Sequence, residues 1–143
     1  GAVGHLSLPD LERIAREVGG DGHHFRFVQL PFNLSMPEAK MRKNQPGPRG
    51  PEPLLRTAED LGLSVVCSAT LLHGRLAEEP LPLLGETFPG LPSQAAQAIQ
   101  FVRSTPGVLS ALVGMKQPAH LEADLAVIRT PLASAEAVEE MFR

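Results

Sequence analysis

Helical and strand-like spacings of apolar residues alternate along this chain of 143 residues. Apolar positions three or four residues apart predict helices with one buried face. We expect such helices at 7–18, 54–61, 93–104 and 118–128, followed by a short one after Ser134. Ser7, Ser93 and Ser134 are predicted N-caps, because a serine hydroxyl accepts a hydrogen bond from a backbone N–H of the first turn.

The same spacing predicts which side of each helix faces the core. Leu11, Ile14, Ala15 and Val18 form the apolar face of the first helix. Ala95, Ala98, Ile99 and Val102 form that of the 93–104 helix, with Gln94, Gln97 and Gln100 expected to face outward. In the 118–128 helix the apolar positions are Leu121, Leu125 and Ile128.

Three further segments, 25–30, 64–69 and 108–115, have β-favouring or continuously apolar residues and are predicted as strands. Strands that alternate with helices about every 40 residues indicate βα units with parallel strands. We therefore expect an α/β fold with three parallel strands, or four, in a single domain over 1–143. The strands belong either to a doubly wound sheet or to an arc of a barrel, since a complete (β/α)8 barrel needs about 250 residues.

Two stretches lack a regular pattern. The Pro- and Gly-rich residues 37–53 are expected to form an irregular surface loop, and residues 77–91 a second one. Lys40, Arg42, Lys43 and Arg49 give the first loop a positive charge that could attract an anion. A solvated flap is the preferred interpretation, because no aromatic residue is interleaved to stack on bases.

Composition narrows the class of protein. A net charge of −3 and a pI near 5.9 argue against a nucleic-acid partner. No apolar run is long enough to span a membrane. Cys67 is the one cysteine, which excludes an internal disulfide and favours a reducing cytoplasm. His23 and His24, with His5, are the only candidate metal ligands, and we expect no metal site because adjacent loop histidines are usually solvent-exposed.

The first residues, GAVGHLSLPDLE, lack the basic start and apolar core of a signal peptide. They also lack an initiator methionine. We expect a cytoplasmic protein whose natural start lies upstream.

Three segments carry a family resemblance. They are FVQLPFN at 27–33, GLSVVCS at 62–68 with LLHGRL at 71–76, and FVRSTPGVLSALVGMK at 101–116 continuing into PAHLEAD at 118–124. Together they resemble the C-terminal part of the aldo/keto reductases, a family of NADPH-dependent (β/α)8 (TIM) barrels. The resemblance covers about 6–128 and implies a partial barrel that binds NADPH.

On the nicotinamide side, the resemblance implies roles for three residues. Gln29 occupies the position of a glutamine near the nicotinamide amide. Cys67 stands where many members have an aromatic residue that stacks on the nicotinamide. Ser68 matches a serine near the cofactor phosphates.

On the adenosine side, the resemblance implies a phosphate-holding turn. Gly114, Met115 and Lys116 match the turn that holds the adenosine 2′-phosphate. His120 and Asp124 match positions that contact the adenine end, where the family often has Arg or Gln and then Asn. The turn leads into a helix, whose N-terminal N–H groups favour anions.

The resemblance also implies that catalysis is incomplete here. Aldo/keto reductases use a Tyr as general acid, aided by Lys, Asp and His from the first half of the barrel. This chain has no tyrosine. We therefore expect the C-terminal NADPH-binding portion of an oxidoreductase, without reductase activity of its own. The alternative is a stand-alone half-barrel that binds small molecules, or hydrolyses esters weakly with Ser68 and His73, oriented by Glu59 or Asp60.

Three strands with helices on one side leave the other face of the sheet uncovered. We expect Val28, Val65, Cys67 and Leu112 on that uncovered face. Exposed apolar area of this kind favours association. The expected partner is a second copy in a homodimer, or a missing N-terminal half.

Overall fold

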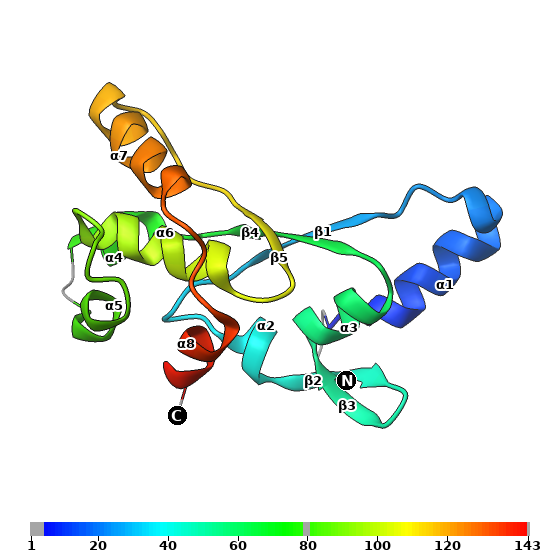
Figure 1. The fold of residues 1–143 in the computed structure, drawn as a ribbon. Helices are drawn as coiled ribbons and strands as arrows, with labels where there is room; N and C mark the ends of the chain where they lie inside the picture. The colour runs from blue at the N-terminus through cyan, green and yellow to red at the C-terminus, as the bar shows by residue number, and fades with distance from the viewer. Residues whose placement is uncertain (1–4, 79–80, 143) are drawn as a thin grey trace.

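A computed structural model describes residues 5–78 and 81–142, and Figure 1 shows its elements in chain order. The strands are β1 (Phe27–Pro31), β2 (Lys43–Gly47), β3 (Gly50–Pro53), β4 (Ser64–Ser68) and β5 (Val108–Ala111). The helices are α1 (Leu8–Gly19), α2 (Glu38–Met41), α3 (Leu54–Asp60), α4 (Arg75–Glu78), α5 (Pro82–Thr87), α6 (Gln94–Ser104), α7 (Pro118–Arg129) and α8 (Ala135–Glu140). Short 3-10 helices cover Gly20–Gly22 and Leu72–Gly74.

The central sheet has three parallel strands in the order β1-β4-β5. This confirms the predicted α/β fold with parallel strands, although β5 ends four residues earlier than predicted. Gln29 pairs with Val66, and Cys67 pairs with Ala111. Because the strands are parallel, their carboxyl ends lie at one edge of the sheet.

The predicted helix starts are also confirmed. The hydroxyls of Ser7, Ser93 and Ser134 accept hydrogen bonds from backbone N–H groups in the first turns of α1, α6 and α8. Between the sheet and its helices, Phe101 of α6 stacks on Phe32 at 5.6 Å between ring centroids and contacts Phe142 at 5.9 Å. These rings form the centre of the core.

Helices cover one face of the sheet, whereas the other face is open along the described strands (Figure 1). Val65 and Cys67 are both 0% exposed and lie on the covered face, and Val28 is partly buried beside them. The prediction that Val28, Val65 and Cys67 line the uncovered face is therefore wrong, whereas Leu112, named with them, is 45% exposed. Alternation along β1 and β4 instead turns Phe27, Gln29, Val66 and Ser68 to the open side.

The predicted irregular loop at 37–53 is also wrong, because it contains α2 and an antiparallel hairpin of β2 and β3. Gln45 is the residue that holds this hairpin in place. Its side chain accepts a hydrogen bond from Leu8 N at 2.8 Å and donates one to the Leu6 carbonyl at 3.1 Å. Residues 77–91 likewise contain helix, since α4 and α5 lie partly or wholly within them.

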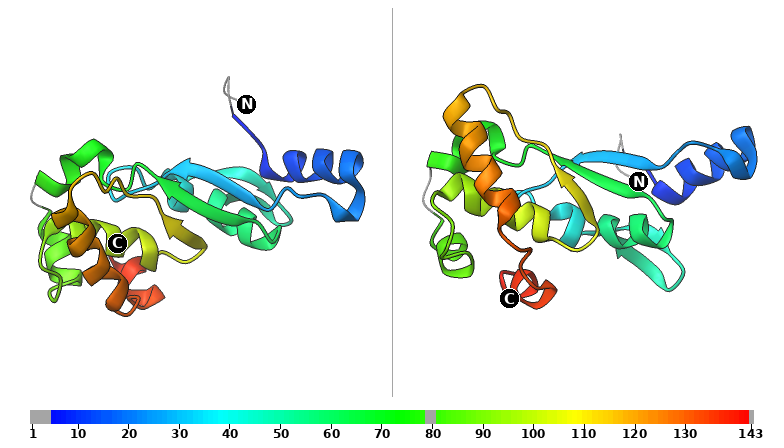
Figure 2. Two further views of the ribbon diagram at one scale, coloured as in Figure 1. Left: turned by 90° about the horizontal axis from the view of Figure 1, so that it is seen from above. Right: turned by 45° about the horizontal axis from the view of Figure 1, so that its top comes forward.

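The two helices at the ends of the arc, α1 and α7, leave most of their predicted inward faces exposed. Val18 of α1 is 86% exposed, and Ile128 of α7 is 67% exposed. Figure 2 shows α1 extending away from the body of the sheet, whereas α7 lies beside α6. In α6, by contrast, Gln100 is buried rather than outward, because its amide donates to the Pro131 carbonyl at 2.6 Å.

Candidate functional site

A cavity of about 980 Å³ opens at the carboxyl ends of β4 and β5. We call it the strand-end cavity. Its walls come from the loop after β4, the start of α6, the segment after β5 and the first turns of α7. It is lined by Ser68, Ala69, Thr70, Leu71, His73, Gly74, Ala77, Glu78, Ser93, Ala95, Leu112, Val113, Gly114, His120, Ala123 and Asp124.

The loop after β4 forms one wall in an unusual backbone conformation. Ala69, Leu72 and His73 all have positive φ, at 55°, 46° and 56°. Residues other than glycine rarely adopt this left-handed region. The Asn33 amide donates to the Ala69 carbonyl at 2.8 Å and so ties this loop to the end of β1.

The opposite wall is the N-terminal half of α7, where His120 and Asp124 lie one helical turn apart. Burial raises the pKa of Asp124 above that of an ordinary carboxyl group, and nearby His120 partly offsets the rise. The Asp124 Oδ2 atom is buried and has no hydrogen-bond partner. An ionised carboxylate in this state needs a donor.

Helix α7 is held mainly from its other end. Val127 is its one buried residue. The Arg103 guanidinium of α6 donates to the Val127 carbonyl at 2.6 Å and to the Thr130 carbonyl at 3.0 Å. This anchor places His120 and Asp124 against the cavity.

Of the residues that the resemblance implies, the cavity lining brings together Ser68, Gly114, His120 and Asp124. Gln29, Met115 and Lys116 are exposed and lie outside that lining. A Cβ added at Gly114 would meet no heavy atom within 4 Å, so the backbone there has open space beside it.

Cys67 cannot reach the cavity, because its side chain lies on the helix-covered face of β4. Burial raises the pKa of its thiol to about 12. The residue therefore offers neither a stacking surface for a ring in the cavity nor a thiolate at neutral pH.

Ser68 and His73 both line the cavity, but the carboxylates expected to orient the histidine do not. Glu59 and Asp60 both pair with Arg56 instead, at 3.2 and 2.9 Å. They lie in α3, which precedes the amino end of β4, whereas the cavity lies at the carboxyl end of that strand.

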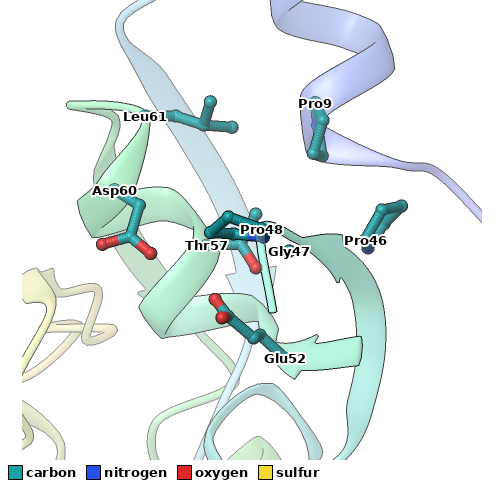
Figure 3. Close-up of a pocket in the computed structure, with 8 residues that line it drawn as sticks. All are labelled: Pro9, Pro46, Gly47, Pro48, Glu52, Thr57, Asp60 and Leu61. Atoms are coloured by element: carbon teal, nitrogen blue, oxygen red, sulfur yellow. The ribbon is translucent and has the colours of Figure 1, made fainter. Parts of the chain in front are cut away.

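Asp60 lines a second, smaller cavity of about 340 Å³. Figure 3 shows its walls, which come from α1, the β2–β3 hairpin and the end of α3. Glu52 points into this region with one buried oxygen that has no partner. This cavity contains none of the residues that the resemblance implies.

The histidines near the amino end of β1 do not form a metal cluster. Contrary to expectation, His23 is buried, with its Nε2 atom 3.6 Å from Glu12 and its ring beside Arg26. In the part of the chain that is described, no three His, Cys, Asp or Glu side chains are grouped to hold a metal.

Among the helices of the described residues, none is long and apolar enough to cross a membrane.

Three cavity residues were not predicted from the sequence to line a site: Thr70, Glu78 and Ser93, of which Ser93 was predicted only as a helix cap. Thr70 is 1% exposed and donates to the Cys67 carbonyl at 3.4 Å. Its position directly after a predicted parallel strand was the available signal, since ligands bind at strand carboxyl ends. Glu78 had no such signal, because it falls in a stretch without a clear pattern.

Comparison with solved structures identifies the fold. The chain matches an aldo-keto reductase from Bacillus halodurans in its holo form with a TM-score of 0.58 and 15% identity, over 91% of this chain and 46% of that one. It matches a thermostable aldo-keto reductase solved with the inhibitor epalrestat with a TM-score of 0.65 and 16% identity, over 96% and 45%. A protein proposed to be 2,5-diketo-D-gluconic acid reductase B matches with a TM-score of 0.64 and 19% identity, over 95% of this chain and 43% of that one.

This chain therefore has the fold of somewhat less than half of an aldo-keto reductase barrel, as the sequence resemblance implied. No protein-family model matches the sequence, and no curated protein matches it.

The residues of the strand-end cavity fit part of a nicotinamide dinucleotide. Hydroxyls of Ser68, Thr70 and Ser93 and the open backbone at Gly114 suit the polar groups of such a ligand. The fit is poor for a 2′-phosphate, because Lys116 lies outside the lining and Asp124 contributes a carboxylate.

Proposed function

We propose that this chain is the cofactor-binding portion of an aldo/keto reductase-like oxidoreductase. The observation that carries the proposal is the strand-end cavity, which collects Ser68, Gly114 and His120 at the carboxyl ends of β4 and β5. Parallel α/β sheets and (β/α)8 barrels bind their ligands at this edge. A nicotinamide cofactor supplies hydride chemistry when bound. We further propose a cytoplasmic setting, which a single unpaired cysteine favours.

In this proposal the chain binds and orients the cofactor. The open space at Gly114 lets a ligand approach the backbone closely, and the first turn of α7 adds N–H groups with partial positive charge. The Ser68 hydroxyl supplies a hydrogen bond at the end of β4. The resemblance implies NADPH as the cofactor.

Carbonyl reduction requires a proton donor as well as a hydride. The resemblance implies a Tyr in the first half of the barrel, and this chain has none. We propose that it does not reduce carbonyl compounds by itself and that the other half of a barrel completes the enzyme.

The open sheet face and the exposed faces of α1 and α7 support a partner for this chain. We propose that the isolated chain self-associates, as a homodimer, where that other half is missing. Phe27, Leu109 and Leu112 are 61%, 62% and 45% exposed, and covering them recovers about 25 cal/mol per Å² of apolar area. Sedimentation velocity at micromolar concentration tests this, and a stable monomer would contradict it.

Calorimetric titration of the full chain with NADH and with NADPH tests cofactor binding. Gly114→Val fills the open space beside the backbone and should weaken binding by about tenfold or more without changing Tm. Gly90→Val is the matched control, because Gly90 also has open space but lies outside the lining. If neither dinucleotide binds at millimolar concentration, the proposed function is wrong.

A further inference from the structure

Among the described residues, the charged side chains that line the strand-end cavity include carboxylates but no lysine or arginine. The two carboxylates are those of Glu78 and Asp124. The imidazoles of His73 and His120 also line the cavity. A phosphate group entering this cavity would meet carboxylates without a permanent positive charge, and like charges repel more strongly there than in water.

Asp124 also has unused hydrogen-bonding capacity. Its Oδ2 atom is buried without a partner, and an ionised carboxylate can only accept hydrogen bonds. A ribose hydroxyl can donate to the Asp124 carboxylate that lines the cavity, whereas an ionised phosphate offers only further acceptors. In other dinucleotide sites an acidic side chain accepts from the ribose 2′-hydroxyl, and an arginine accommodates the 2′-phosphate.

We propose that the strand-end cavity selects a nicotinamide dinucleotide with a free 2′-hydroxyl, NADH or NAD⁺, over its 2′-phosphorylated form, and that Asp124 sets this choice. This inference rests on the proposed cofactor-binding function. It places Asp124 on the adenosine ribose, and it reverses the NADPH preference that the family resemblance implies.

The experiment compares NADH and NADPH binding to the full chain near pH 8, by fluorescence titration. Since burial raises the pKa of Asp124, an alkaline buffer keeps its carboxylate ionised. NADH should bind about tenfold more tightly than NADPH. Asp124→Asn should remove most of that preference by tightening NADPH. Glu122→Gln changes the same charge at an exposed position of α7 and should leave the preference unchanged.

Each other outcome overturns a defined part of the inference. Equal affinities, or tighter NADPH, would refute the selection while leaving cofactor binding intact. An Asp124→Asn protein with native Tm and an unchanged affinity ratio would show that Asp124 contacts another group, such as the adenine amine. Absence of binding by both dinucleotides at millimolar concentration would remove the proposed function and this inference with it.

Discussion

Replacing Arg103 with methionine should release α7 from α6 and so disturb one wall of the strand-end cavity. The Arg103 Nη1 atom lies 2.6 Å from the Val127 carbonyl, 3.0 Å from the Thr130 carbonyl and 2.8 Å from Gln100 Oε1. Its two protons serve three acceptors, so we count two hydrogen bonds. At about 1.5 kcal/mol each for a charged donor, Arg103→Met should lose about 3 kcal/mol.

Methionine keeps most of the apolar stem of arginine, so the change reports the polar contacts rather than packing. Amide hydrogen exchange should accelerate throughout α7, and urea denaturation should show the loss of stability. Arg129→Met is the control, because Arg129 is exposed in the last turn of α7. If exchange in α7 stays at the wild-type rate and stability falls by less than about 0.5 kcal/mol, the proposed anchor is wrong.

Three further changes test the core, the thiol and the hairpin. Phe101→Ala empties the centre of the ring cluster and should cost about 3–5 kcal/mol in urea denaturation. Burial raises the pKa of Cys67 to about 12, so the folded thiol stays protonated while the unfolded one ionises near 9.0. Stability should therefore fall as pH rises from about 9 to 12, and a denaturation midpoint that is constant over this range would contradict the burial. Gln45→Ala leaves the buried Leu8 N–H unpaired and should cost about 1–3 kcal/mol, measured by thermal unfolding.

The sequence predicted the three parallel strands, the longer helices between them and the helix starts, because these depend on local patterns. Apolar spacing and a serine hydroxyl at Ser7, Ser93 or Ser134 act within a few residues. Alternation of strands and helices then leaves few topologies, of which a parallel sheet is the simplest. The roles expected for Ser68 and Gly114 came from the family resemblance and not from this pattern.

The errors arose where long-range contacts decide the structure. Three consecutive apolar residues, Val65 to Cys67, do not show which strand face is covered, whereas pairing with β1 and β5 does. The hairpin at 43–53 depends on Gln45, whose partners lie 37 and 39 residues away. For Val18 and Ile128, spacing located an apolar stripe but said nothing about whether another element covers it.

Three left-handed residues in the loop after β4 have an evolutionary consequence. Ala69, Leu72 and His73 each adopt a conformation that costs a side-chain-bearing residue about 1–2 kcal/mol, and glycine would escape that cost. Selection for thermal stability alone should therefore favour glycine at these positions. A glycine at position 73 would remove the imidazole of His73 from the cavity where a ligand is expected to bind. A gain in stability there would therefore weaken ligand binding.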